Sequence, residues 1–262
     1  MSECKPAKTP LEINFKIEKP TKVDEEAMAK YPYQRLIGAL IYLAVTTRPD
    51  IAFAVNHMSQ FNTNYNMQHW GAAKRILRYL KGTRDYGLLY TKINKRLYGV
   101  VDADWGANLI DRRSYSGYAF VLAGASVSWE ARKQRTVALS STEAEYMAMT
   151  EATKEAMYLL GILKDLGISY EKVTLFNDSQ SVQELIQGLG YSSRTKHIDV
   201  RHHFVTECYH TGKIALTYMP TEDMPTDVLT KSLSSVKHCK CSTTLGMTNS
   251  LTTSRGGVGA TK

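Results

Sequence analysis

The sequence predicts an α/β protein in which a mixed five-stranded sheet flanked by helices follows a small helical region. Two observations carry this prediction. Up to about residue 94, helix-length apolar blocks alternate with short polar breaks, whereas from Leu97 onward the apolar runs have the length of strands. Three such runs follow one another, and strands and helices then alternate. That order is typical of a mixed sheet with helices packed on its faces.

The first 94 residues divide into two parts. Residues 1–25 mix Lys, Glu and Pro, so we expect an extended lead-in. Within residues 26–94 we expect three helices. Thr47 is a candidate cap and Pro49 suits a first helical turn, which places the start of the second helix, and Gly82 suits the end of the third. The expected helices cover residues 33–45, 51–61 and 68–81.

The sheet-forming part covers residues 95–235. Gly124 separates the second and third apolar strand runs, and Gly167 ends a long helical pattern. We expect strands over 97–103, 116–124, 125–131, 173–177 and 213–219, and helices over 141–166, 179–187, 197–210 and 222–233. In the last helix Pro225 would fall in the first turn, so we expect the helix to survive it. Residues 236–262 end in a Ser/Thr/Gly-rich stretch and are expected to form a disordered tail.

The composition limits the class of protein. Of the 262 residues 43% are hydrophobic, which is enough for a sizeable core. No apolar run approaches the roughly 18 residues of a membrane span, and the first residues lack the apolar core of a signal peptide. We therefore expect an intracellular protein, cytoplasmic or nuclear, without a membrane partner. The four scattered cysteines argue against a disulfide framework, and the cluster from His238 to Cys241 lacks a second ligand pair at zinc-like spacing.

The positive charge is unevenly distributed. The net charge is +8, yet residues 26–94 carry nine Lys or Arg and only three acidic residues. A polyanion that is held by this region and acted on by the next fits such a distribution. On the third expected helix, basic residues share the face opposite the apolar stripe, or flank it. We expect them to touch a nucleic-acid backbone, with an ordinary solvated helix face as the alternative: Lys74, Arg75, Arg78, Lys81 and Arg84.

Four carboxylates lie at strand ends or on the inward side of a helix: Asp102, Glu145, Asp178 and Asp227. Acids at such positions cost free energy unless cations compensate them, and oxygen ligands suit Mg²⁺ or Mn²⁺. Each acid also has an ordinary structural explanation. Asp102 can be a turn acid, Asp178 a helix N-cap, and Asp227 a partner of a helix dipole. The neighbouring Asp104 has the same strand parity as Asp102 but lies past the expected strand end.

Glu145 has to be distinguished from Glu143. Both fit a capping box, Glu143 with Ser140 and Glu145 with Thr142, so capping does not decide between them. The helix face does decide. Glu145 is in line with an apolar stripe that should meet the sheet, namely Ala148, Met149, Ala152, Ala156 and Leu159. Glu143 is on the more polar face.

Eight motifs in matching order resemble the C-terminal part of copia-type retrotransposon polyproteins. They are YQRLIGALIYLAVTTRPDIAFAV, HWGAAKRILRYLKGT, DADWG, DRRSYSGYAF, VSWEARKQRTVALSSTEAEYMAM, NDSQSV, SRTKHIDVRHHF and PTDVLTK. The resemblance implies a ribonuclease H (RNase H)-like domain over residues 95–235, preceded over residues 26–94 by the thumb or connecting part of a reverse transcriptase. It places the metal-binding acids at Asp102, Glu145, Asp178 and Asp227. Two departures, Gly106-Ala107 after Trp105 and Thr226 before the last acid, leave these acids intact.

The implied activity is cleavage of the RNA strand of RNA/DNA hybrids by an endoribonuclease with two Mg²⁺ ions, or Mn²⁺ in their place. The implied partners are the hybrid and the remaining palm and fingers segment of the reverse transcriptase. No YxDD motif is present, so polymerase activity is not expected from this chain. Two rival interpretations were weighed. An integrase would need an Asp–Asp–Glu order, which the sequence lacks. A catalytically inactive retrotransposon remnant that binds nucleic acid or a protein stays an alternative.

Overall fold

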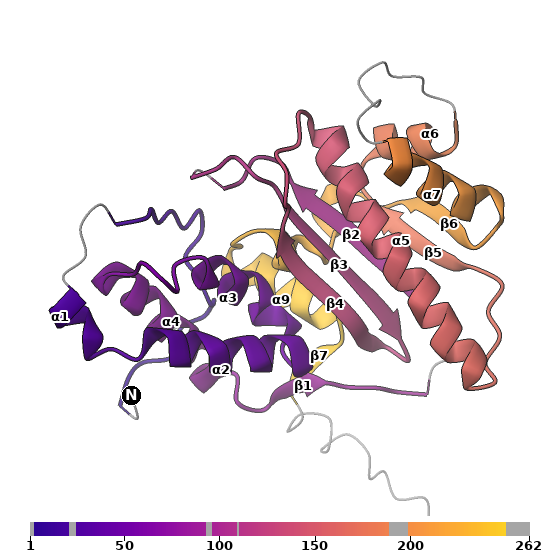
Figure 1. Ribbon diagram of the computed structural model, residues 1–262. Helices are drawn as coiled ribbons and strands as arrows, with labels where there is room; N and C mark the ends of the chain where they lie inside the picture. The colour runs from indigo at the N-terminus through magenta and orange to yellow at the C-terminus, as the bar shows by residue number, and fades with distance from the viewer. Residues whose placement is uncertain (1–2, 21–24, 93–95, 109, 189–198, 250–262) are drawn as a thin grey trace, which may run out of the picture.

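The computed structural model describes residues 3–20, 25–92, 96–108, 110–188 and 199–249. At its centre is a five-stranded sheet in the order β4-β3-β2-β5-β6, with helices on both faces (Figure 1). The predicted mixed five-stranded sheet flanked by helices is thereby confirmed. The strands are β2 (Tyr98–Asp104), β3 (Tyr115–Leu122), β4 (Ala125–Lys133), β5 (Val173–Asn177) and β6 (Ile214–Tyr218).

The sheet changes direction at β2. This strand pairs antiparallel with β3 on one side and parallel with β5 on the other. The last register pair between β2 and β5 joins Val100 to Phe176. Asp102 follows Val100 by two residues, and Asp178 likewise follows Phe176 by two residues. The carboxyl ends of two parallel strands therefore bring two of the predicted acids to the same edge, next to a topological switch point.

One face of the sheet is covered by α5 (Ser141–Asp165), together with α6 (Gln180–Ile186) and α7 (Asp199–His210). Helix α5 buries the stripe read from the sequence, since Ala148, Met149, Ala152 and Ala156 are at most 1% exposed. These side chains form one core cluster with the β2 residues Val101 and Ala103. The stripe thus fixes which side of α5 faces the sheet.

The opposite face meets the N-terminal helices, which are α1 (Glu25–Ala29), α2 (Tyr33–Thr46), the 3-10 helix η1 (Pro49–Ile51), α3 (Ala52–Ser59) and α4 (Met67–Gly82). Helix α3 packs against β4. The indole Nε1 of Trp129 on β4 donates a 2.8 Å hydrogen bond to the carbonyl of Ala44 on α2. The helices and the sheet therefore share one core cluster. Within the described part of the chain, no helix combines the length and apolar character that crossing a bilayer requires.

The helix expected over residues 222–233 is interrupted. A 3-10 turn, η3 (Thr221–Asp223), is followed by a separate short helix, α8 (Asp227–Thr230). Met224, the residue before Pro225, is extended with ψ 106°. A proline disfavours the helical conformation in the residue that precedes it, so the expectation that the helix survives Pro225 was wrong. The break sets the direction of α8 and of the acid at its first position.

The tail expected to be disordered is ordered as far as residue 249. Ser234 caps helix α9 (Ser235–Thr244), and strand β7 (Met247–Asn249) pairs antiparallel with β1 (Tyr86–Leu88). Leu245 and Met247 are buried, so a few apolar anchors hold a segment whose composition is otherwise polar. The expectation of disorder was therefore wrong for residues 236–249, and residues 250–262 lie outside the described residues.

Residues 3–20 contain no helix or strand, yet they pack against α4. Ala7 and Leu11 are buried in the core that the N-terminal helices share, and the Ala7 amide donates to the Arg78 carbonyl at 3.2 Å. The lead-in is thus an extended segment fixed to the helical region.

Candidate metal centre

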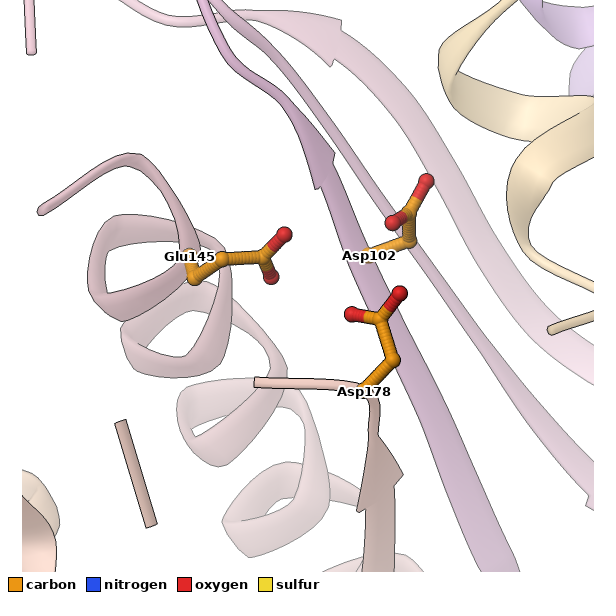
Figure 2. Close-up of side chains that lie close together, drawn as sticks. All are labelled: Asp102, Glu145 and Asp178. Atoms are coloured by element: carbon orange, nitrogen blue, oxygen red, sulfur yellow. The ribbon is translucent and has the colours of Figure 1, made fainter. Parts of the chain in front are cut away.

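Three carboxylates converge where β2 and β5 end. Asp102 comes from β2, Glu145 from the second turn of α5, and Asp178 from the residue after β5. The Glu145 and Asp178 carboxylates point toward Asp102, whose own carboxylate turns away from α5 (Figure 2). One oxygen of each lies within 4.8 Å of one oxygen of each of the others. The structure therefore brings together three of the four acids singled out in the sequence.

The start of α5 explains why Glu145 points inward. Ser140 is the N-cap and accepts the Glu143 amide at 3.1 Å, while the Glu143 carboxylate accepts the Leu139 amide at 2.7 Å. Glu143 thus has the structural role at the helix start. Glu145 is 8% exposed, and its Oε1 accepts the amide of Ala103 at 3.2 Å. Its Oε2 is buried without a hydrogen-bond partner in the described structure.

Asp178 is not a helix cap. Ser179 takes that role, because its side chain accepts the Val182 amide at the start of α6. Asp178 is half-buried, and its Oδ2 accepts a 2.7 Å hydrogen bond from the Thr221 hydroxyl. The carboxylate is thus free of a capping role and is oriented by η3.

Asp102 is 2% exposed and faces α8, on the side of the sheet opposite to α5. Its Oδ2 accepts a short hydrogen bond from the Thr230 hydroxyl and lies 3.7 Å from the Lys231 ammonium. Strand β2 extends to Asp104, so the expectation that Asp104 lies past the strand end was wrong. The two acids differ instead in position, since Asp102 and not Asp104 belongs to the converged group.

The fourth acid, Asp227, is held apart from this group. It is fully buried at the first position of α8, and each of its oxygens faces an ammonium. Its Oδ1 lies 2.8 Å from Lys231 Nζ, and its Oδ2 forms an ion pair with Lys237. Lys231 therefore links Asp227 to Asp102, and the predicted set of four ligands is present as three carboxylates plus one that is joined through a lysine.

The electrostatics of the three converged acids favour a cation. Burial raises the pKa of both Asp102 and Glu145. The charges of Asp102 and Asp178 raise the pKa of Glu145 further, whereas Lys231 opposes the rise at Asp102. Oxygen-only donors, mutual repulsion and a buried Glu145 oxygen without a partner fit a hard divalent ion such as Mg²⁺ or Mn²⁺.

The basic residues singled out on α4 lie largely against the lead-in. The Arg75 guanidinium is 2.9 Å from Glu12, Arg78 Nε donates to the Lys5 carbonyl at 2.7 Å, and Lys81 donates to the Cys4 carbonyl at 2.8 Å. Lys74 lies over the Trp70 ring at 5.9 Å, and Arg84 is exposed. Three of the five are thus committed to the chain's own N-terminal segment, and contact with nucleic acid stays a prediction for all five.

Four residues of the site were missed by the sequence reasoning, namely Thr221, Thr230, Lys231 and Lys237. Lys231 had a signal, because it follows Asp227 by four residues in PTDVLTK, the spacing of an ion pair on one helix turn. Lys237 had none, because it lies in the segment expected to be disordered.

Comparison with solved structures finds similarity to RNase H proteins. One is RNase H1 from the halophilic archaeon Halobacterium salinarum NRC-1, with 19% identity, 52% of this chain and 95% of that chain covered, and a TM-score of 0.38. Another is LC11-RNase H1 in complex with an RNA/DNA hybrid, with 14% identity, 52% and 94% covered, and a TM-score of 0.40. No protein-family model matches the chain.

The curated relatives include Pol polyproteins of transposons. The retrovirus-related Pol polyprotein from transposon TNT 1-94 of Nicotiana tabacum is 41% identical over 94% of this chain and 19% of its own length. That from transposon RE2 of Arabidopsis thaliana is 34% identical over 94% and 17%. Secreted RxLR effector protein 161 of Plasmopara viticola is 53% identical over 50% of this chain and 94% of its own length.

The chain thus spans about a fifth of the length of the Pol polyproteins it matches, while they cover nearly all of it. At 34–41% identity over this span, its homologues are retrovirus-related Pol polyproteins of copia-type transposons.

Proposed function

We propose that this chain carries a ribonuclease H that cleaves the RNA strand of RNA/DNA hybrids, as part of a retrotransposon reverse transcriptase. The observation that carries the proposal is the convergence of Asp102, Glu145 and Asp178 at the carboxyl ends of β2 and β5. The similarity to Pol polyproteins supports it, since reverse transcription generates such hybrids. The remaining palm and fingers segment of the reverse transcriptase is the proposed protein partner.

The chain's own residues would hold the ions and orient the scissile phosphate. Asp102, Glu145 and Asp178 would supply oxygen ligands for Mg²⁺, with Mn²⁺ as the alternative, and Asp102 would be shared by two ions because it neighbours both Asp178 and Asp227. Divalent ions held by these carboxylates would supply a lowered pKa for the attacking water and positive charge near the leaving 3′ oxygen. The expected products carry 5′-phosphate and 3′-hydroxyl ends.

Thr221, Thr230 and the Ala103 amide fix the directions of the three carboxylates by hydrogen bonds. Ligands held in this way lose little freedom when they bind an ion or a phosphate, which is how a preorganised site lowers a barrier. Selection of the RNA strand would come from its 2′-hydroxyl groups, read across the shallow groove of the hybrid.

The test is cleavage of a hybrid whose RNA strand carries a label, with Mg²⁺ or with EDTA. Asp102→Asn keeps the side-chain volume and removes a ligand charge, so we expect cleavage to be lost while the thermal unfolding transition remains. Asp165→Asn is the matched control, because Asp165 is an exposed acid at the C-terminal end of α5 and lies outside the converged group. Full cleavage by Asp102→Asn, or Mg²⁺-independent cleavage, would falsify the proposal. Hybrid binding without any cleavage by the unaltered chain would favour an inactive remnant.

A further inference from the structure

Lys231 lies between two buried carboxylates of the candidate centre. Its Nζ is 2.8 Å from Asp227 Oδ1 and 3.7 Å from Asp102 Oδ2. The side chains of Asp227 and Asp102 are 0% and 3% exposed, whereas that of Lys231 is 31% exposed. Because buried carboxylates need a compensating positive charge, the Lys231 ammonium is the cation that serves both of them in this structure.

The four acids therefore divide into two halves that share Asp102. In the first half, Asp102, Glu145 and Asp178 gather their oxygens within 4.8 Å of one another. Within the described residues, no Lys or Arg forms an ion pair with Glu145 or Asp178, and one Glu145 oxygen has no partner. In the second half, Asp102 and Asp227 are bridged by Lys231. One half is open to a cation, whereas the other already contains the ammonium groups of Lys231 and, on Asp227 Oδ2, of Lys237.

We propose that Lys231 occupies the position of the second divalent ion, so that this ammonium and that ion compete for Asp102 and Asp227. The inference rests on the proposed function, because it concerns the ions of that same site. The first ion binds to Asp102, Glu145 and Asp178 while Lys231 stays in place. The second ion binds only as Lys231 leaves, and Lys231 thereby sets the affinity of the second site as a positioning residue.

The Lys231 ammonium can leave the two carboxylates and move into solvent when a divalent ion binds. A dication and an ammonium that share the same carboxylate oxygens repel each other strongly in a buried site. Lys231 follows the last residue of α8, has a flexible stem and is one-third exposed, so its ammonium can move into water. Lys237 remains on Asp227 Oδ2 when Lys231 moves, so Asp227 keeps a positive partner throughout the exchange.

The experiment is a titration of the full chain with Mn²⁺ in the absence of nucleic acid, followed by electron paramagnetic resonance and calorimetry. We expect the unaltered chain to bind one ion tightly and a second ion more weakly. Lys231→Met should tighten the second site by about tenfold or more, since it removes the competitor, and should change the first site much less. Lys231→Arg keeps the charge and should leave the second site weak.

Lys240→Met is the matched control, because Lys240 pairs with Asp223 and contacts none of the four acids. We expect both sites unchanged in this variant. If Lys231→Met does not fold, the unaltered chain still tests the inference. Acetylation of Lys231, mapped by mass spectrometry, should accelerate as the second ion binds and the ammonium moves into solvent.

Three results would overturn the inference. They are an unchanged or weakened second site in Lys231→Met, a single bound ion in both proteins, or acetylation that does not respond to Mn²⁺. Cleavage of the hybrid, measured on the same samples, separates this inference from the proposed function. Ion binding as expected without cleavage removes the proposed function alone. Cleavage together with an unchanged second site in Lys231→Met removes the inference alone.

Discussion

Gly117 on β3 lies directly opposite Asp102 on β2, and the absence of its side chain lets α8 approach the sheet. A Cβ at this position would lie 2.7 Å from the Cβ of Leu229 and 2.9 Å from the Cγ2 of Thr230. Thr230 is the residue whose hydroxyl bonds to Asp102. The distance between α8 and the candidate metal centre therefore depends on the absence of a methyl group at position 117.

We expect Gly117→Ala to displace α8 and to impair the site without altering any acid. Overpacking of this kind costs about 1–3 kcal/mol of folding free energy, and a displacement of about 1 Å near a catalytic group can reduce the rate about 100-fold. Denaturant unfolding and hybrid cleavage would measure the two effects.

The control for that variant is Gly161→Ala. Gly161 is exposed in the interior of α5, and a Cβ there would have no atom within 4 Å. Alanine should stabilise the helix by roughly 0.5–1 kcal/mol and leave cleavage intact. Equal effects of the two substitutions would show that the close approach of α8 is not what makes Gly117 important.

The segment from α9 to β7 should contribute strongly to stability. A chain that stops at Ser234 loses the buried Leu245 and Met247, each worth roughly 2 kcal/mol, and loses Lys237 from Asp227. We expect its thermal unfolding temperature to fall well below that of a chain that stops at Asn249. Identical unfolding temperatures would mean that this segment is not packed as described.

The basic residues of α4 and its vicinity should separate into two groups. Arg78→Met removes the 2.7 Å hydrogen bond to Lys5 and should lower the free energy of unfolding by about 1 kcal/mol. Lys74→Met combined with Arg84→Met should leave stability unchanged and should reduce the slope of hybrid affinity against salt by about two units. An unchanged salt slope in that double variant would rule out a role for these two residues in holding nucleic acid.

The buried His69 and the half-buried His57 predict a loss of stability in acid. Burial lowers the pKa of His57 and of His69 from 6.5 to about 4 in the folded chain, and for His57 the charge of Lys133 adds to the effect. Between these two pH values the unfolded chain binds more protons, so the free energy of unfolding falls as the pH drops. Each histidine should contribute roughly 1 kcal/mol per pH unit within this window.

The measurement is denaturant unfolding at several pH values from 7 to about 4. His57→Gln has no imidazole to protonate. The slope of its free energy of unfolding against pH should therefore be shallower than that of the unaltered chain by about 1 kcal/mol per pH unit. A parallel pair of slopes would show that His57 is protonated in the folded protein as readily as in the unfolded one.

The sequence was sufficient for those parts of the site that depend on local periodicity. Strand alternation and strand ends predicted Asp102 and Asp178, and the apolar stripe of α5 separated Glu145 from Glu143. These positions follow from the pleat of a strand and the pitch of a helix, which one sequence displays directly.

Other features were out of reach because they depend on contacts between distant segments. The pairing of Asp227 with Lys237 requires α9, whose polar composition gave no reason to expect order. Strands β1 and β7 have three residues each, too few for a periodic signal. The break at Pro225 and the end of β2 were local features that were misjudged, the first because a proline restricts the residue that precedes it.

The hydrogen bond from the Trp129 indole to the Ala44 carbonyl makes this side chain an intrinsic optical probe of how the N-terminal helices dock on the sheet. Separation of the N-terminal helices from the sheet would expose the Trp129 indole to water and shift its fluorescence to longer wavelength. Replacing Trp70 and Trp105 with Phe would leave a single emitter, and stopped-flow mixing with a hybrid would then record whether the helices move when substrate arrives.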